Sequence, residues 1–336
     1  MNTDSSTFGN PPQKTVRLAC IGLGYIFRQV HAKALSLLQT RGWPVEVAMV
    51  CDREQTALDT ARQYFPFTKT TQNPDDILGS CEEVDALLIC LWPPLGLKVL
   101  HQAIDRGFKN ILIEKPVSHH ATDIQSVAEM ASRAGVRVDV AYNRRHHPAL
   151  SSFSDAIHQL NPLESVTATL LRVDRKEPIF YQDVTPHPLS VLHHILGDIT
   201  VKNVAFGKPK NDIPESLEAS LQSTSGVQVL LKIRPSSGEE LELYAAKSAS
   251  QYLVLPFLPS KSPAGAGWDC IQAGVSEFHG IPNPKGLDEA LTSIWRMGYL
   301  SQMADFFRTE PSPHACSLQQ AASILHISET IWNWPR

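Results

Sequence analysis

VRLACIGLGYIF, residues 16–27, joins an apolar run to a glycine-rich turn and is the stretch that decides the fold. The run Val16–Ile21 has the length and composition of a buried strand, and a helical pattern follows from about Ile26 to Leu38. A strand that ends in a Gly-x-Gly turn and opens a helix is the setting of a dinucleotide-binding fingerprint. The alternative is a strand–turn–helix unit that binds no ligand.

Strand and helix patterns continue to alternate up to residue 146. Such alternation predicts βαβ units, which close into a parallel sheet, and apolar runs without polar alternation fit strands covered on both faces. The expected strands are Val45–Cys51, Val84–Leu91, Asn110–Ile113 and Val136–Tyr142, and the expected helices are Gln55–Tyr64, Leu97–Arg106 and Ala121–Ala134.

The pattern changes after about residue 147, where several runs alternate apolar with polar residues. That alternation predicts an antiparallel sheet with one wet face. The expected strands are Ser165–Arg175, Leu217–Gln222, Val227–Ile233, Glu240–Ala245 and Tyr252–Phe257. Helices are expected near His187–Leu196, Leu287–Arg308 and Leu318–Trp332, and a long ordered loop over Pro256–Pro284.

Composition excludes several classes of protein. The net charge of −4, from 30 basic and 34 acidic residues, gives no field to hold a nucleic acid backbone. No apolar run approaches the roughly 20 residues that span a bilayer, and the polar residues 1–14 form a loose tail without a signal-peptide pattern. We therefore expect a soluble, cytoplasmic protein that engages neither nucleic acid nor membrane.

Cysteine and histidine spacing predicts no metal site. The six cysteines include no C-x-x-C pair, and no H-E-x-x-H or similar close ligand set occurs. Adjacent histidines project in different directions, so a pair does not form one two-ligand face. We expect most of these paired residues at the surface or at an interface: His119, His120, His146, His147, His193 and His194.

The glycine-rich turn and the end of the second strand form the expected cofactor site. Gly22 permits the tight turn, and Gly24 lets the backbone approach a pyrophosphate at the helix N-terminus. Asp52 follows the second strand, where an acid accepts hydrogen bonds from the adenosine ribose and repels a 2′-phosphate. Arg53 would instead attract that phosphate, so NAD is favoured and NADP remains open. Asp52 could also serve as a helix N-cap.

Four further segments, in their order along the chain, resemble the Gfo/Idh/MocA family of glucose–fructose oxidoreductase and inositol dehydrogenase relatives. They are Pro93-Pro94 after the third main strand, Glu114-Lys115-Pro116, Tyr142-Asn143-Arg144-Arg145, and the Asp-x-x-x-His pattern from Asp183 to His187. The resemblance covers nearly the whole chain after the tail. It implies a Rossmann domain followed by a domain built on an open, mostly antiparallel sheet.

The resemblance implies that Lys115 and His187 are catalytic, with Asp183 nearby. A base must take the hydroxyl proton as hydride leaves the carbinol carbon, and an ammonium stabilises negative charge that develops on that oxygen. Thr185-Pro186 looks like an N-cap followed by proline, which places His187 in a first helical turn, where the dipole disfavours an imidazolium. The alternatives are a structural histidine and a surface lysine.

The remaining expected contacts follow from the same resemblance. For the cofactor they are Gly22, Gly24, Tyr25, Ile26, Asp52, Arg53, Trp92, Pro93, Glu114, Lys115 and Asn143. For the substrate they are Arg144, Ser190 and His194.

The sequence departs from the family pattern at four of its positions. Phe27 replaces the third small residue of the turn, and this bulk should alter the contact between helix and strand. Trp92 and Leu97 stand where a small polar residue and a histidine are common; Trp92 could form a flat wall beside the nicotinamide or pack in the core. Ser190 replaces an acid that often holds a polyhydroxylated substrate, which suggests a less hydrophilic substrate.

We therefore predict a tail over residues 1–14, a dinucleotide-binding Rossmann domain over 15–146, and a substrate-binding and oligomerisation domain over 147–336. The expected activity is NAD(P)-dependent interconversion of an alcohol and a carbonyl on a sugar, a cyclitol or a related biosynthetic intermediate. The alternatives are a C=N reductase and a non-catalytic regulator that senses the dinucleotide. A homodimer or homotetramer through the open sheet is expected.

Overall fold

In a computed structural model, the chain is described over residues 10–173, 180–210, 213–236, 240–258, 275–277 and 286–335. It divides into two compact units, Met1–His146 with Asn283–Ala322 and His147–Pro282 with Ser323–Arg336. The first unit thus ends where the sequence pattern changes, but residues 283–322 return to it and do not belong to the C-terminal domain expected over 147–336. Residues 1–9 of the predicted tail, and most of the predicted loop over 256–284, lie outside the described residues.

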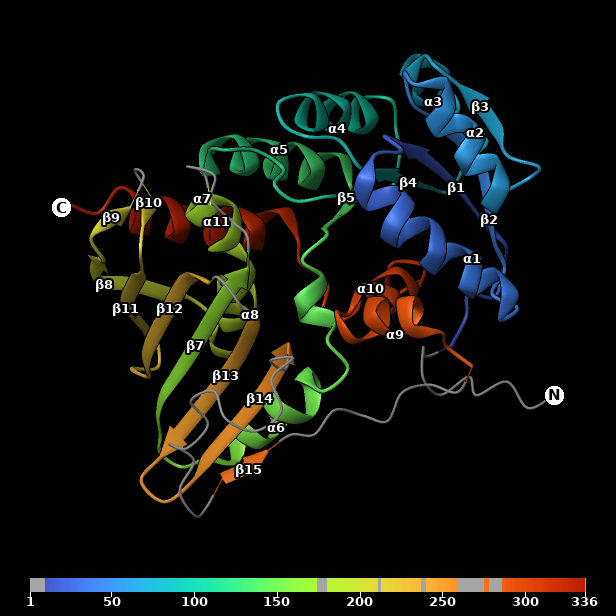
Figure 1. Ribbon diagram of the computed structural model, residues 1–336. Coiled ribbons are helices and arrows are strands. Elements are labelled where there is room, and N and C mark those ends of the chain that lie inside the picture. The colour runs from blue at the N-terminus through green and yellow to red at the C-terminus, as the bar shows by residue number, and fades with distance from the viewer. Residues whose placement is uncertain are drawn as a thin grey trace. The chain divides into compact units, whose positions relative to one another are not determined.

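A six-stranded parallel sheet forms the centre of the first unit, in the order β3-β2-β1-β4-β5-β6 (Figure 1). The strand order reverses between β1 and β4, and α/β folds bind ligands outside the carboxyl ends of the strands at such a point. The predicted parallel sheet is confirmed. Its strands are β1 (Val16–Ile21), β2 (Val45–Cys51), β3 (Lys69–Thr71), β4 (Ala86–Ile89), β5 (Asn110–Ile113) and β6 (Arg137–Val140).

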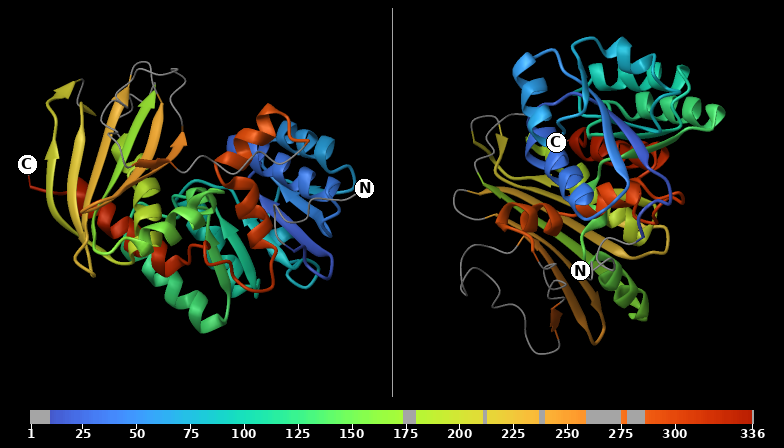
Figure 2. Two further views of the ribbon diagram at one scale, coloured as in Figure 1. Left: turned by 90° about the horizontal axis from the view of Figure 1, so that it is seen from below. Right: turned by 90° about the vertical axis from the view of Figure 1, so that its right-hand side faces the viewer.

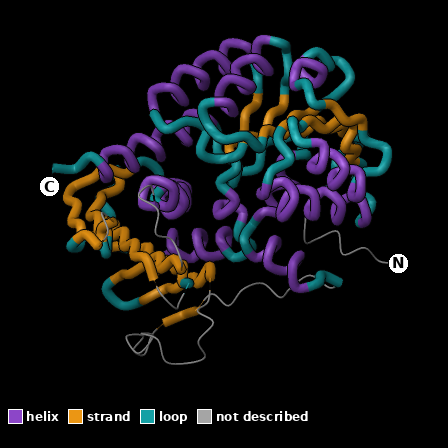
Figure 3. Tube along the Cα trace, turned by 45° about the horizontal axis from the view of Figure 1, so that its top comes forward, coloured by secondary structure: helices purple, strands orange, loops and turns teal. Residues whose placement is uncertain are grey.

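Helices surround this sheet, as the tube in Figure 3 shows. Their apolar sides close the core, and Leu35, Leu38 and Leu58 are buried in it. The helices are α1 (Ala32–Thr40), α2 (Gln55–Tyr64), α3 (Pro74–Leu78), α4 (Leu95–Asp105) and α5 (Ala121–Ala134), with a 3-10 turn, η2 (Asn143–His146). The sequence did not predict β3 or α3, because both are short and β3 carries only Lys and Thr.

The helix after the glycine-rich turn begins irregularly. Residues Phe27–His31 form a π-helix, η1, before α1 starts at Ala32, so the single α-helix expected from Ile26 to Leu38 is wrong in its first turns. Phe27 itself is buried in the core of the unit. The π-helix begins at the bulky residue that replaces the small one.

The returning segment contributes two helices, α9 (Glu289–Arg296) and α10 (Tyr299–Phe306), which pack against α1. We expected one helix over Leu287–Arg308. Gly298 interrupts it with a φ of 83°, a left-handed conformation that glycine adopts without steric cost. Trp295 and Phe306 are buried.

A seven-stranded sheet dominates the second unit, in the order β15-β14-β13-β7-β12-β11-β8, and is mostly antiparallel, as expected. Parallel pairing occurs between β7 and β12 and between β14 and β15. The strands lie side by side in Figure 2. They are β7 (Leu163–Val173), β8 (Ile199–Phe206), β11 (Leu217–Ser223), β12 (Gln228–Ser236), β13 (Leu241–Ser248), β14 (Tyr252–Leu258) and β15 (Val275–Glu277).

Helices pack on the second unit's sheet, α8 against β7 and α6 against β14. The sequence predicted neither α6 nor strand β8. A small ladder joins β9 (Pro209–Lys210) to β10 (Ile213–Pro214). The helices are α6 (Leu150–Gln159), α7 (Phe180–Val184), α8 (Pro186–Leu196) and the last turns of α11 (Leu318–Trp332). Within the described ranges, no helix combines the length and apolarity that crossing a bilayer requires.

Candidate active site

The glycine-rich turn follows β1 at the point where the strand order reverses. Gly22 has a φ of 90° and donates its N–H to the carbonyl of Cys51 at 2.9 Å. A Cβ atom on Gly22 would stand 2.5 Å from the carbonyl oxygen of Cys90, so only glycine fits between these strand ends. A Cβ atom on Gly24 would meet nothing within 4 Å. The backbone at Gly24 therefore faces open space, as a turn that cradles a pyrophosphate requires.

Asp52 ties the end of β2 to this turn. One of its carboxylate oxygens accepts the N–H of Leu23 at 2.7 Å, and the other accepts the N–H of Glu54 at 2.9 Å. Glu54 is the N-cap residue of α2, so the alternative that Asp52 caps this helix is wrong. The spacing of Asp52 from the glycines is longer than usual, yet the fold brings its carboxylate directly against the turn.

Arg53 does not share this position. Its side chain is 90% exposed, and its Nε lies 3.1 Å from the carboxylate of the adjacent Glu54. The guanidinium that could have favoured a 2′-phosphate is thus already paired. Arg28 is a cation at the turn that the sequence analysis missed: its Nη1 donates to the carbonyl of Leu23 at 2.8 Å.

Two aromatic side chains are exposed near the same strand ends. Tyr25, in the glycine-rich turn, is 75% exposed, and Trp92, which follows β4, is 64% exposed. Trp92 is therefore not a core residue, which leaves the flat wall as its expected role. Pro93 is half-buried beside Trp92, and Ile26 packs partly against the core.

Glu114 and Lys115 follow β5, the neighbour of β4. The N–H of Glu114 donates to the carbonyl of Ile89 at 2.9 Å and continues the sheet pairing beyond the strand. Glu114 is 7% exposed; its Oε1 lies 2.7 Å from Nε2 of His31, and its Oε2 accepts the N–H of Lys115 at 3.2 Å. Lys115 is half-buried, and the Lys115–Pro116 peptide is cis. The sequence analysis missed His31, which no motif of the sequence singles out.

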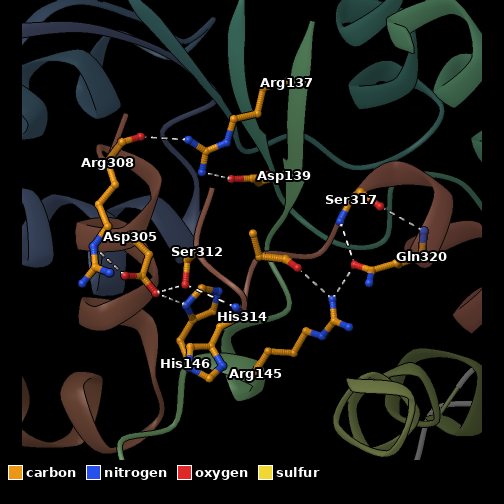
Figure 4. Close-up of polar contacts among 11 residues, drawn as sticks. Arg137, Asp139, Arg145, His146, Asp305, Arg308, Ser312, His314, Ser317 and Gln320 are labelled. Atoms are coloured by element: carbon orange, nitrogen blue, oxygen red, sulfur yellow. Dashed lines mark hydrogen bonds and ion pairs between the residues drawn. The ribbon is translucent and has the colours of Figure 1, made fainter. Parts of the chain in front are cut away.

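The segment that follows β6 is held by buried polar groups (Figure 4). Arg145 donates through Nη1 to the carbonyl of Ala315 at 3.0 Å and to Gln320 at 2.9 Å. Asn143 is buried and donates through Nδ2 to the carbonyl of Met297 at 2.7 Å. These bonds join the segment to the returning residues 283–322. Arg144, expected at the substrate, is also buried.

His146 completes this anchor. Its Nδ1 lies 2.9 Å from Oδ2 of Asp305, which also accepts the hydroxyl of Ser312 at 2.8 Å (Figure 4). Burial raises the pKa of Asp305, but hydrogen bonds from His146 and Ser312 outweigh it, and the net direction is downward. Burial is also the main cause that lowers the pKa of His314, beside His146, to about 4.

We expected most paired histidines at the surface or at an interface, but three of the six are buried within the chain. His146, His147 and His193 are buried, whereas His119 and His120 are exposed and His194 is half-buried. His147 stacks on Phe257 with ring centroids 4.0 Å apart, and burial lowers its pKa to about 3.

In the second unit, His187 lies in the first turn of α8 and is buried. Thr185 does not cap this helix: its backbone is helical, its N–H bonds the carbonyl of Tyr181 at 2.9 Å, and its hydroxyl donates to the same carbonyl. The expected N-cap is therefore wrong, because α7 leads directly into α8. Asp183, half-buried, lies one helical turn before His187.

Ser190 is fully buried, and its hydroxyl donates to the carbonyl of His187 at 2.6 Å. This bond stabilises the first turn of α8 around His187. In the part of the chain that the structure covers, no group of three or more His, Cys, Asp or Glu side chains could hold a metal ion.

Comparison with known proteins agrees with this geometry. Residues 16–142 match the GFO_IDH_MocA family, described as an oxidoreductase family with an NAD-binding Rossmann fold. Oxidoreductase P35 of Formosa agariphila is 20% identical over 305 residues, which cover 84% of this chain and 88% of that protein.

Solved structures share the fold over nearly the whole chain. A myo-inositol dehydrogenase from Corynebacterium glutamicum ATCC 13032 is 15% identical, with a TM-score of 0.73, over 95% of this chain and 96% of that one. GenD2 from gentamicin A biosynthesis, in complex with NAD, is 16% identical, with a TM-score of 0.72, over 96% of both chains. Residues 16–142 thus resemble the NAD-binding Rossmann fold by which the GFO_IDH_MocA oxidoreductase family is described.

Proposed function

We propose that the protein interconverts an alcohol and a carbonyl on a sugar, a cyclitol or a related biosynthetic intermediate, with NAD as its cofactor. The observation that carries this proposal is the placement of Lys115. It follows β5 directly, at the carboxyl edge of the parallel sheet, on the same edge as the glycine-rich turn.

The residues of the first unit fit a dinucleotide. The open backbone at Gly24 and the N-terminus of the following helix suit a pyrophosphate, and the Asp52 carboxylate suits a ribose hydroxyl. Each Asp52 oxygen accepts one backbone N–H and keeps a further lone pair for that hydroxyl. Asp52 also disfavours a 2′-phosphate, and Arg53 is paired with Glu54, so NAD is preferred over NADP.

NAD, when bound, supplies the hydride acceptor or donor at the substrate carbon. We assign the proton chemistry to the chain: His187 takes the hydroxyl proton in the oxidation direction, and the Lys115 ammonium stabilises the negative charge that develops during hydride transfer. Asp183, one turn before His187, assists in orienting the imidazole. Arg144 and His194 are assigned to substrate binding, and the exposed Trp92 ring to the wall beside the nicotinamide.

The substrate class rests on similarity. One similar solved structure is a myo-inositol dehydrogenase, and another comes from gentamicin A biosynthesis. Ser190 is buried and stands where an acid is common, so it offers a substrate no carboxylate. This supports a less hydrophilic member of the proposed substrate class.

A steady-state assay at the nicotinamide absorbance band tests the proposal. The purified protein is given NAD or NADP with a panel of polyols and sugars, and NADH or NADPH with the corresponding ketones. We expect turnover with NAD and at least one member of the panel. Tight NADH binding without turnover on any member would contradict an enzyme and favour the dinucleotide-sensing regulator.

Lys115→Met tests the assignment of that residue. The variant removes the ammonium without a large change in volume, so we expect the NADH dissociation constant to change less than about threefold. Turnover should fall by roughly a hundredfold or more, the effect of losing proton-transfer or oxyanion stabilisation. Lys98→Met, on the exposed side of α4, is the matched control and should keep full turnover.

A further inference from the structure

A buried histidine–carboxylate pair lies directly beneath the Lys115 turn. His31 is 1% exposed, and its Nε2 is 2.7 Å from Oε1 of Glu114. The two residues are 83 positions apart in the chain and come from different elements, η1 and the end of β5. Burying a carboxylate is unfavourable unless it is hydrogen-bonded. This pair therefore has a desolvation free energy that two apolar side chains would not have.

Both oxygens of the Glu114 carboxylate have partners. Oε1 bonds His31, while Oε2 accepts the backbone N–H of Lys115 at 3.2 Å. The backbone N–H of Glu114 is itself fixed to Ile89 in the neighbouring strand at 2.9 Å. The carboxylate thus bridges a helix and the peptide that carries the Lys115 side chain.

The π-helix sets the direction of His31. Phe27–His31 is the only π-helical segment among the described residues, and His31 is its last residue. Each residue added to or removed from a helix rotates the later side chains by about 100°. A regular α-turn at this point would therefore turn the imidazole away from Glu114.

The surroundings of His31 favour one tautomer. Nδ1 is buried and has no hydrogen-bond partner in the described part of the chain, and the ring meets Tyr299 edge-on, with centroids 6.4 Å apart. A neutral imidazole with its proton on Nε2 donates to Glu114 and leaves only a lone pair without a partner.

We propose that His31 is a positioning residue for the reaction. By holding Glu114, it fixes the Glu114–Lys115 peptide and so determines where the Lys115 ammonium stands relative to the glycine-rich turn at the start of its own helix. The effect on turnover rests on the proposed role of Lys115. The structural step, that His31 holds the Glu114–Lys115 peptide in place, does not depend on that role.

The structural step is tested by exchange of the Lys115 amide hydrogen, measured by NMR without substrate or cofactor. We expect His31→Leu to accelerate this exchange at least tenfold, and His31→Gln, whose amide still donates to Glu114, to restore most of the protection. His146→Leu is the matched control, because it removes a similar buried bond to Asp305 in the same unit. That variant should leave the Lys115 amide as in the wild type.

The kinetic step is tested with the best substrate of the panel. His31→Leu should lower kcat about tenfold or more, with the NADH dissociation constant within threefold of the wild type and partial rescue by His31→Gln. Should His31→Leu fail to fold, Glu114→Gln takes its place, and both readouts should move in the same direction.

The outcomes separate the two proposals. Full turnover in Lys115→Met overturns the role of Lys115, whatever the exchange data show. If Lys115→Met is inactive while His31→Leu keeps its kcat, or if the Lys115 amide stays protected in His31→Leu, the positioning role of His31 is overturned.

Discussion

At the scale of single residues, Asp52 shows how one side chain serves both the fold and the proposed cofactor. Its carboxylate accepts backbone N–H groups from the glycine-rich turn and from the start of α2. The sequence predicted an acid at the end of the second strand and its role toward a ribose. It could not predict the bond to Leu23, because that contact depends on how the loops after the neighbouring strands β1 and β2 meet.

Asp52→Asn should weaken NAD binding and reduce the preference over NADP. The amide keeps the shape but loses the charge, and hydrogen bonds to a charged acceptor are about twice as strong as neutral ones. We expect NADH affinity to fall roughly tenfold and NADPH affinity to change less, measured by calorimetry. Asp59→Asn, on the exposed side of α2, is the control and should bind as the wild type. Tighter NADH binding in Asp52→Asn would contradict the ribose role.

The buried polar cluster around Asp305 should make the first unit sensitive to acid. Burial lowers the pKa of His314 to about 4, below the unfolded value of about 6.5, so the unfolded chain binds a proton more readily between these values. The pKa of Asp305 is also lowered. The stabilising contribution of its carboxylate is therefore lost as the pH falls through this lowered pKa. Stability should therefore decrease from about pH 6.5 toward pH 4.

His314→Gln isolates the histidine contribution. A lowering from about 6.5 to about 4 corresponds to at most about 3 kcal/mol of unfolding free energy between neutral and acid pH. We expect the variant to lose less stability than the wild type over this range, measured by urea unfolding at several pH values. Parallel pH profiles in the two proteins would show that His314 does not contribute.

At the scale of elements, the local sequence predicted the bounds of elements that are long and periodic. It failed where tertiary contacts determine how a helix begins or ends. β1, β2, α2, β5 and α5 match their predicted bounds, whereas the first helix begins as a π-helix and the helix expected over Leu287–Arg308 breaks at Gly298. Thr185 looked like a cap, but the preceding helix α7 already satisfies its N–H. Sequence alone does not reveal such neighbours.

The two glycines of the β1 turn should respond differently to alanine. Gly22→Ala puts a Cβ 2.5 Å from the Cys90 carbonyl in a backbone with positive φ, so we expect a loss of about 2 kcal/mol or more and weak NADH binding. Gly24→Ala meets no neighbour, so the fold should be retained while the added methyl group reduces NADH affinity. Thermal unfolding and calorimetry separate the effects; equal unfolding midpoints for the two variants would contradict this reading of the turn.

At the scale of the whole molecule, the order of the segments predicted both sheets and the change of pattern near residue 147. The sequence did not predict that residues 283–322 return to the first unit, because their partners lie far away along the chain. Arg145 bonds Gln320, and His146 bonds Asp305. The candidate residues of the first unit, from Gly22 to Lys115, lie on one edge of its sheet, as a parallel fold requires. Only the fold identified His31 as a neighbour of these residues.

The second unit's sheet leads to the last prediction, self-association through its less covered face. Along β7 and β13, alternate residues are buried, and the residues between them are half-buried: Thr167 pairs in register with Ala245, and Thr169 with Leu243. These small and apolar side chains form a continuous patch, which a second copy of the chain would cover. We expect a homodimer or homotetramer by sedimentation velocity at micromolar concentration. Leu243→Arg should dissociate it, because a buried unpaired charge is costly, while Gln125→Arg on the exposed side of α5 should not. A wild-type protein that sediments as a monomer at these concentrations would rule out this interface.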